Sequence, residues 1–376
     1  MEQNFTNKKE LVLTFIPIQY YITIYNIILL IFAIAVFANS NQLVLEDSHN
    51  LDRKKSLGVF VCFFIIIYIG LRPVNFRFGD MVIYDILFKS YINGEVPTYK
   101  KDILFDFVMY NFSKFKSSIL FFFFCCLVYV LPLYFACKKI FKDYWFYAFF
   151  MLVISFSFWS YGTNGIRNGM ATSLFILGLS KKNFAPKIMI LLLAVLLHKS
   201  LILPFLAYLI TLYYNKPRIL LFLWFTAIPV SFILGGFFTN LFLNLGLVEE
   251  DRLTGYFSEF NQAAEGVVFK VGFRWDFLLY SASGVYAGWY FIFKRNFVDV
   301  FYSQLFNIYL IVNAFWVLVI RANFSNRFAY LSWFLLGILI IYPLLKSRFF
   351  SNQHQVIGRI IMIYFIFTFF MNVVLS

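Results

Sequence analysis

Charged residues and cysteines are both scarce in this sequence. Asp, Glu, Lys and Arg make up 13% of the 376 residues, against about 25% in soluble globular domains. The four cysteines, Cys62, Cys125, Cys126 and Cys137, lie in or beside apolar runs, which is not the spacing of a disulfide framework or a zinc site. Walker loops, nucleophile elbows and Gly-rich dinucleotide turns are also missing. Together these absences exclude a soluble enzyme, a nucleic-acid-binding protein and a secreted disulfide scaffold.

Hydrophobic residues dominate instead, at 62% of the chain, with 54 phenylalanines. Long apolar runs recur from end to end, and their continuous rather than alternating pattern disfavours a β-barrel. The first run is too long for a signal-peptide core and predicts a retained helix. The sequence therefore predicts an all-α polytopic membrane protein with about 11–12 transmembrane helices. The apolar segments cover roughly residues 12–38, 57–71, 118–137, 144–160, 166–180, 186–213, 219–237, 277–293, 301–320, 328–345 and 357–375.

The segment 186–213 decides the topology, because it forms either one long helix or two short helices broken near His198 and Lys199. Lys and Arg residues in short loops collect on the cytoplasmic side. With the break, six cytoplasmic loops hold sixteen Lys and Arg residues, and the short outer loops hold four. Without the break, every later loop changes side, and the Lys and Arg residues of the loops no longer collect on the cytoplasmic side. We therefore expect the break, both termini outside, and cytoplasmic loops at residues 39–56, 138–143, 181–187, 214–218, 294–300 and 346–359.

Two long loops are then expected on the outer face of a single transmembrane domain over residues 1–376: residues 72–117 and residues 238–276. In the first loop, Ile103, Phe107 and Phe112 are spaced as on one helix face, which predicts an interfacial or re-entrant amphipathic helix. The second loop carries the acidic run 249–251, which is typical of a solvated surface. The net charge of +14 fits cytoplasmic loop charge and anionic ligands.

Polar clusters at the outer ends of the expected helices are the candidate site. They lie at residues 72–80, 162–169, 198–200 and 321–330. Their arginines run against the positive-inside bias, and a cation inside the membrane costs up to about 2.5–3.5 kcal/mol on insertion scales. Such arginines pair with internal carboxylates, reach lipid headgroups, or bind an anionic ligand; the planar guanidinium suits phosphate especially well. The candidate arginines are Arg72, Arg77, Arg167 and Arg327.

Two residues in these clusters could act as a general base. His198 interrupts an apolar stretch, and histidine changes charge near neutral pH, so it could accept a proton from an attacking hydroxyl. A buried histidine is also commonly structural. Asp80 follows Arg72 and Arg77 closely, and it could either act as the base or orient the arginines. The sequence leaves these roles open.

At these residues the chain resembles the EpsG family, membrane proteins similar to the Wzy-type O-antigen and exopolysaccharide polymerases. The first landmark is Arg72 and Arg77 followed by Gly79-Asp80 and Tyr84; the second is Ile166-Arg167-Asn168-Gly169; the third is His198-Lys199-Ser200; the last is Arg327-Phe328-Ala329-Tyr330. Two positions depart from the family pattern, since Asn168 replaces a frequent Gln and Gly79 a frequent Thr. Neither change alters a charge, and the landmarks span about residues 60–335.

The resemblance implies a GT-C-like enzyme that polymerises repeat units on undecaprenyl pyrophosphate at the outer face of the bacterial inner membrane. We expect an inverting, metal-independent glycosyltransferase that makes O-antigen, capsule or exopolysaccharide without a cofactor. Arginines can stabilise the charge that develops on the leaving pyrophosphate. Arg72, Arg77, Arg167 and Arg327 would bind the pyrophosphate, His198 or Asp80 would serve the acceptor hydroxyl, and Tyr84, Asn168, Ser200 and Tyr330 would support them.

The expected partners are the lipid-linked oligosaccharide donor and acceptor and membrane lipid, with a chain-length regulator as a candidate further partner and no nucleic acid. Two alternatives remain open. A transporter or flippase of the lipid-linked oligosaccharide would also use an arginine-lined cavity. Transporters, however, commonly have internal repeats and broken helices that meet near mid-membrane, whereas here no repeat is evident and the polar residues gather at one face. A membrane acyltransferase that modifies a glycan would use a buried histidine, but it leaves the arginines unexplained.

Overall fold

The computed structural model describes residues 12–99, 102–244, 273–321 and 326–375. In these ranges the regular secondary structure is helical and no strand occurs, so the predicted all-α fold is confirmed. The chain divides into two compact units: Met1–Leu201 with Leu344–Ser376, and Ile202–Pro343. The sequence did not indicate this division, and a single transmembrane domain over residues 1–376 stays a prediction.

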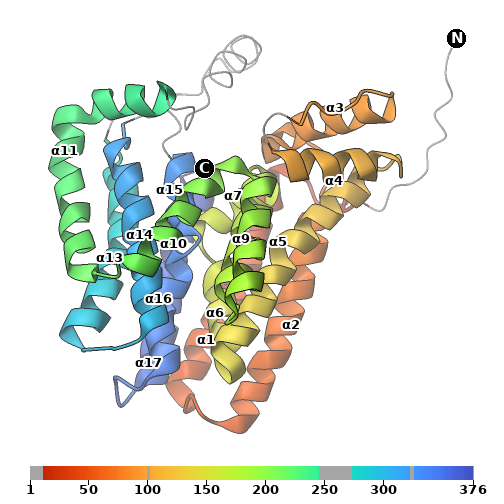
Figure 1. Ribbon diagram of the computed structural model, residues 1–376. Coiled ribbons are helices and arrows are strands. Elements are labelled where there is room, and N and C mark those ends of the chain that lie inside the picture. The colour runs from red at the N-terminus through yellow and green to blue at the C-terminus, as the bar shows by residue number, and fades with distance from the viewer. Residues whose placement is uncertain (1–11, 100–101, 245–272, 322–325, 376) are drawn as a thin grey trace, which may run out of the picture. The chain divides into compact units, whose positions relative to one another are not determined.

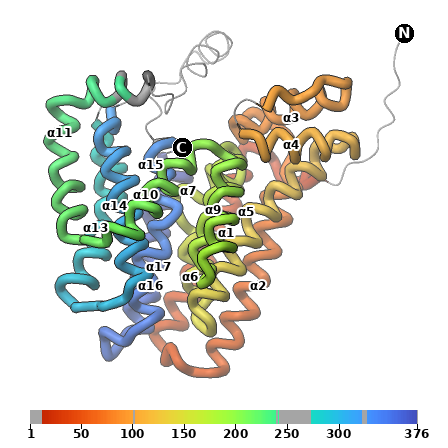
Figure 2. The backbone as a smooth tube through the Cα atoms, viewed as in Figure 1, coloured from red at the N-terminus to blue at the C-terminus, as the bar shows by residue number. Residues whose placement is uncertain are grey.

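The first unit holds the helices before residue 201 and the last helix of the chain. Helix α17 returns to pack against α1, and α5 packs against both α2 and α8. Figure 2 shows α2 and α5 side by side along their length. The helices of this unit are α1 (Tyr21–Gln42), α2 (Ser48–Gly70), α3 (Met81–Ile92), α4 (Ile103–Ser113), α5 (Ser118–Phe141), α6 (Trp145–Val153), α7 (Phe156–Thr163), α8 (Ile166–Leu179), α9 (Phe184–Leu197) and α17 (Gln353–Phe369).

The second unit is built around α14, which packs against α10, α11, α13 and α15. Asp299 caps the start of α14, because its carboxylate accepts a hydrogen bond from the Tyr302 N–H at 2.8 Å. Its helices are α10 (Ile202–Tyr213), α11 (Pro217–Asn244), α13 (Trp275–Trp289), α14 (Val300–Leu318) and α15 (Asn326–Trp333), together with most of α16 (Leu336–Lys346).

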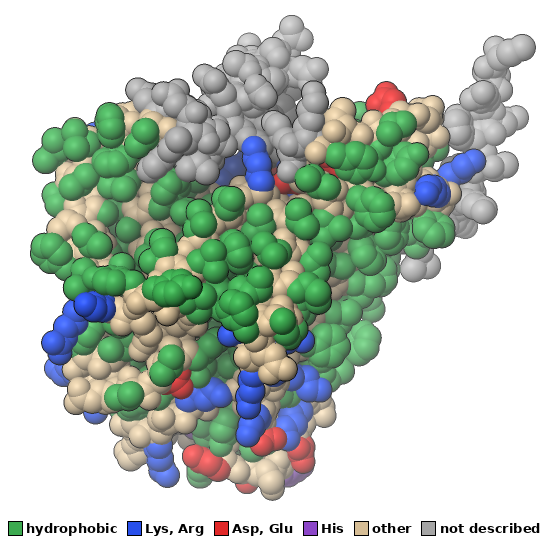
Figure 3. All heavy atoms as spheres, viewed as in Figure 1, with side chains coloured by type: hydrophobic (Ala, Val, Ile, Leu, Met, Phe, Trp, Pro, Cys, Tyr) green, Lys and Arg blue, Asp and Glu red, His purple; other side chains and the backbone are tan. Residues whose placement is uncertain are grey.

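Six stretches of helix among the described residues are long and apolar enough to cross a membrane, which confirms a polytopic membrane protein. Shorter apolar helices include α4, α9 and residues 199–213. Figure 3 shows hydrophobic side chains covering the visible face of α5 and α9, as a lipid-facing surface would. The total of about 11–12 crossings stays a prediction. The six stretches are Ile18–Gln42, Ser118–Val153, Pro217–Phe238, Val300–Leu318, Arg327–Lys346 and Gln353–Val374.

The loop expected at residues 72–117 contains two short helices, α3 and α4, which pack against each other near the start of α5 (Figure 1). Helix α4 occupies the position of the amphipathic helix predicted there, and its location at a membrane interface stays a prediction. Its buried side carries Phe105 and Met109, while Ile103 and Phe107 are about half exposed, as an interfacial helix requires. The other expected loop, 238–276, begins inside α11, and residues 245–272 with their acidic run lie outside the described residues.

The predicted break near His198 is confirmed. Helix α9 ends at Leu197, and His198 has an extended backbone with φ −153° and ψ 114°. A 3-10 turn, η4 (Lys199–Leu201), then leads to α10. Because helix α9 ends before His198, the His198 side chain does not lie on a face of α9. It lies instead in the site described next.

Candidate functional site

Four segments of the first unit meet at one place: the turn after α2 with α3, the start of α4, the α7–α8 turn, and the break after α9. The packing of α4 against both α3 and α9, and of α8 against η4, brings them together. The segments are far apart in sequence, so tertiary packing rather than local spacing creates the site.

The centre of the site is Asp102, which precedes α4 and is 2% exposed. Its carboxylate accepts hydrogen bonds from the Arg167 guanidinium, from His198 Nδ1 at 3.1 Å and from the Lys199 backbone N–H at 3.0 Å. A buried carboxylate is stable only when such donors satisfy it. Burial raises the pKa of Asp102, but His198, Arg167 and the Lys199 N–H more than offset this effect and hold the pKa at about 2. The carboxylate is therefore ionised at neutral pH.

The Asp102 carboxylate determines the tautomer of His198. An ionised carboxylate only accepts hydrogen bonds, so the neutral imidazole must carry its proton on Nδ1. The lone pair is then on Nε2, which is the arrangement of a histidine general base oriented by an acid. The imidazole is mostly buried, with 9% of the residue exposed. The sequence alone did not show this pairing.

Arg167 lies on the other side of Asp102, one residue into α8. Its Nε donates to the Tyr84 hydroxyl at 3.0 Å while its terminal nitrogen pairs with Asp102. The guanidinium also lies over the rings of Tyr84 and Phe105, 5.3 and 5.8 Å from their centroids. Burial raises the pKa of Tyr84 to about 12, and Arg167 opposes that rise. Tyr84 therefore stays a neutral hydroxyl that accepts a hydrogen bond from the arginine. Through the contacts of Arg167 with Tyr84 and Asp102, and of His198 with Asp102, the three sequence motifs lie close together.

Asp80 lies at the start of α3 and is 7% exposed. Its backbone N–H donates to Asn164 Oδ1 at 2.9 Å, which ties the turn after α2 to the α7–α8 turn. Gly79 makes this approach possible: its φ is +62°, and an added Cβ would lie 2.4 Å from the Asn164 side chain. The structure therefore explains why this position is a glycine.

The two earlier arginines have different surroundings. Arg72 is 1% exposed, donates to the backbone carbonyls of Ile69 and Thr163, the latter at 3.2 Å, and lies over the ring of Phe78. Burial lowers the pKa of Arg72 to about 10, so it stays charged at neutral pH. Arg77 is exposed. Pyrophosphate binding by either residue stays a prediction, but the surroundings of Arg72 favour a positioning role.

The remaining predicted residues are Ser200 and Asn168 of the first unit and Arg327 and Tyr330 of the second. Ser200 is half-buried in η4, and the side-chain oxygen of Asn168 is buried without a hydrogen-bond partner among the described residues. Arg327 and Tyr330 lie on α15 in the second unit, where the Tyr330 ring packs on Trp333 at 5.4 Å between ring centroids. The supporting roles of Ser200, Asn168 and Tyr330 and the pyrophosphate-binding role of Arg327 stay predictions.

Asp102 is the residue that the sequence reasoning missed as a site residue. The available signal was an acidic residue at the start of the predicted amphipathic helix. No group of three or more His, Cys, Asp or Glu side chains that could hold a metal occurs in the part of the chain that the structure describes. Metal independence stays a prediction.

Comparison with known proteins gives one finding. The model of the EpsG family matches residues 55–376, which include every candidate site residue. No curated protein and no solved structure matches the chain.

Proposed function

The chain belongs to the EpsG family, and we propose that it is an inverting glycosyltransferase that polymerises undecaprenyl-pyrophosphate-linked repeat units at the outer face of the bacterial inner membrane. Membership of the family indicates a polysaccharide-polymerase type of function for this multi-pass membrane protein. The observation that carries the finer proposal is the contact of one buried carboxylate, Asp102, with both His198 and Arg167.

In this mechanism Nε2 of His198 takes the proton from a hydroxyl of the acceptor repeat unit. The hydroxyl oxygen attacks the anomeric carbon of the donor glycan, and the bond from that carbon to the pyrophosphate oxygen breaks. The electron pair stays on the undecaprenyl pyrophosphate, and the proton stays on His198. One displacement of this kind inverts the anomeric configuration. Asp102 stabilises the imidazolium that forms, as the acid of a catalytic triad does.

Positive charge beside the base supports the departure of the pyrophosphate. Arg167 is held between Asp102 and Tyr84, and Lys199 follows the base directly. We propose that Arg77, which is exposed after α2, also contacts the donor diphosphate, and that the enclosed Arg72 holds the turn that presents it. Fixed cations at the site of developing charge lower the barrier without a metal ion.

Asp80 is the competing base, and replacement of His198 separates the two candidates. We expect His198→Gln to lower polymer formation by about 10²–10⁴-fold, the usual effect of losing a general base. The measurement uses purified protein in lipid nanodiscs, given lipid-linked repeat units, with product length read on gels. We expect Asp80→Asn to raise the donor concentration needed for half-maximal rate.

Two results would contradict this assignment. Substantial turnover by folded His198→Gln would make His198 structural, and a larger loss in Asp80→Asn at saturating donor would make Asp80 the base. In cells, a deletion strain should carry glycan limited to single repeat units. Its accumulation on the cytoplasmic side would indicate a flippase instead.

A membrane acyltransferase remains a second candidate, because an Asp–His pair can also activate a glycan hydroxyl toward an acyl donor. The two reactions differ in their product. An acyltransferase adds an acyl group to a repeat unit of unchanged length, whereas a polymerase increases the number of repeats, and mass spectrometry of the product distinguishes them.

A further inference from the structure

A pocket of about 440 Å³ lies at the other end of helix α5, away from Asp102. Helix α5 has 24 residues and therefore rises about 36 Å, enough to cross the hydrocarbon core. The α4 end of α5 adjoins the candidate site, and the pocket lies where α5 ends and α6 begins, beside the first turns of α2. Its size is within the range of about 300–1,000 Å³ that is usual for small-molecule sites.

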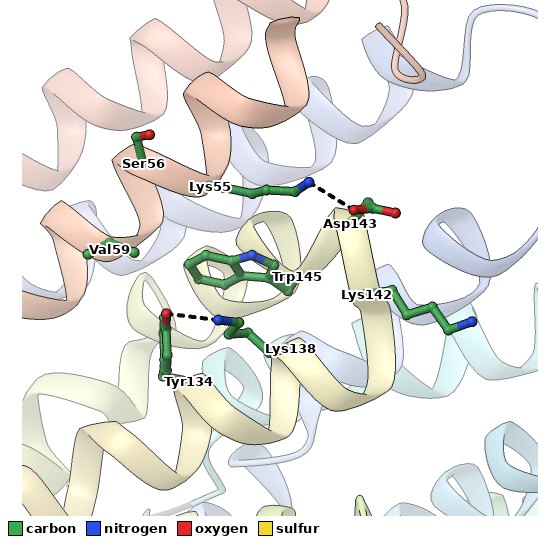
Figure 4. Close-up of a pocket in the computed structure, with 8 residues that line it drawn as sticks. All are labelled: Lys55, Ser56, Val59, Tyr134, Lys138, Lys142, Asp143 and Trp145. Carbon is green, nitrogen blue, oxygen red and sulfur yellow. Dashed lines mark hydrogen bonds and ion pairs between the residues drawn. The ribbon is translucent and has the colours of Figure 1, made fainter. Parts of the chain in front are cut away.

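Lysines and aromatic rings dominate the pocket lining. Figure 4 shows Lys55 and Lys138 on either side of the Trp145 indole, while Lys142 extends away from it. Lys55 pairs with Asp143 at 2.8 Å. Lys138 has no carboxylate within ion-pair distance in the described ranges of the chain. The pocket thus holds a cation with which no carboxylate of the described residues forms an ion pair.

Lys138 is exposed and contacts aromatic side chains. Its Nζ donates to the Tyr134 hydroxyl at 3.3 Å and lies 5.1 Å from the Tyr134 ring centroid and 6.0 Å from that of Trp145. An ammonium group has three donors, and this contact uses one. Tyr and Trp rings are typical of the membrane–water interface, where one end of the side chain is apolar and the other is solvated.

The apolar surface next to the pocket points to a lipid rather than a free anion. Val59, which lines the pocket, is 37% exposed, and Phe63, one turn further along α2, is 61% exposed. On α5, Leu131 and Leu127 precede Tyr134 on the same face and are partly exposed. A cationic pocket that continues into exposed apolar side chains offers contacts to both the phosphate and the acyl chains of one molecule.

We propose that this pocket binds the phosphate headgroup of an anionic phospholipid, with Lys138 as the principal cation and the Val59 and Phe63 face of α2 contacting the acyl chains. Basic pockets between helices are known to bind anionic headgroups, and each nearby Lys contributes a favourable free energy to that binding. The proposal does not depend on the reaction at Asp102, because the two sites lie at opposite ends of α5.

The test measures lipid binding to the full-length protein in phosphatidylcholine nanodiscs with and without phosphatidylglycerol. Native mass spectrometry should show retained phosphatidylglycerol, and the lipid should raise the Tm. Lys138→Ala should weaken this binding about fivefold, and Lys138→Arg should retain it. The matched control is Lys182→Ala, an exposed lysine in the α8–α9 loop, which should bind like the wild type.

Three outcomes would overturn the proposal. Equal retention of phosphatidylglycerol by Lys138→Ala and the wild type would exclude the pocket. An equal loss in Lys182→Ala would mean that overall basic charge, not this pocket, attracts the lipid. A Tm rise with inorganic phosphate alone that matches the lipid and disappears in Lys138→Ala would identify a free-anion site. Because all variants are compared by Tm in phosphatidylcholine, a folding defect is detected separately.

Discussion

Replacement of Asp102 by Asn tests the site most directly, because this change keeps the shape of the side chain and removes its charge. The carboxylate satisfies three donors, from Arg167, His198 and Lys199. Removing one partner of a buried ion pair costs about 3–5 kcal/mol, mostly because the other charge is left uncompensated. We therefore expect Asp102→Asn to lower the Tm clearly.

A second change separates stability from chemistry. Removing both partners of a buried polar contact is far less costly than removing one, so adding Arg167→Gln to Asp102→Asn should recover most of the lost stability. The recovery gives the coupling free energy of the pair in a double-mutant cycle. Activity should not recover, because His198 still lacks the carboxylate that fixes its tautomer. Loss of that carboxylate lowers turnover about 10⁴-fold in serine proteases.

The pH dependence of stability gives an independent measure. The pKa of Asp102 is about 2 in the folded protein and 3.8 in the unfolded chain. This shift contributes about 2 kcal/mol to the free energy of unfolding. Because the folded-state pKa is depressed, this stabilisation is present above pH 3.8 and is lost as the pH falls toward 2. As the pH falls through this window, the Tm of the wild type should decrease more than the Tm of Asp102→Asn. A folded Asp102→Asn protein with wild-type turnover would refute the reasoning.

Further predictions concern the turn after α2. Gly79→Ala should destabilise the protein by about 1–3 kcal/mol, because its φ of +62° suits glycine alone. The added Cβ would also clash with the Asn164 side chain. Adding Asn164→Ala removes this clash but not the backbone strain, so it should restore only part of the Tm. Arg77→Ala should weaken donor binding with little change in Tm, since the side chain is exposed, whereas Arg72→Ala should lower the Tm because it leaves the Ile69 and Thr163 carbonyls without their donor. Equal Tm values for the two arginine variants would contradict this distinction.

Features that follow from local sequence were predicted well. The length of the apolar runs predicted the helical membrane class, and the charge of the loops predicted the break at His198. Both signals depend only on residues that are close together in the sequence. Arg167, Tyr84 and His198 were named as site residues on motif grounds, and the structure brings them around one carboxylate.

Features that depend on packing between distant segments were not predicted. Asp102 lies 65 residues from Arg167 and 96 from His198, so its role depends on how α4 packs against α9. Arg72 looked like Arg77 in the sequence, but only the fold encloses it among carbonyls and rings. The division into two compact units also left no sequence signal, because long apolar helices occur in both units.

The close packing of α1 with α17 bears on the order in which this protein is made. A Cβ on Gly358 would lie 1.9 Å from the Ser40 hydroxyl oxygen, so the first and last helices of the first unit touch with little space for larger side chains. The ribosome must therefore deliver the whole second unit, Ile202–Pro343, to the membrane before the first unit can close. During that interval the buried face of α1 needs a temporary neighbour, either lipid or an insertion chaperone. Truncation before α17 should yield a chain that inserts but is degraded.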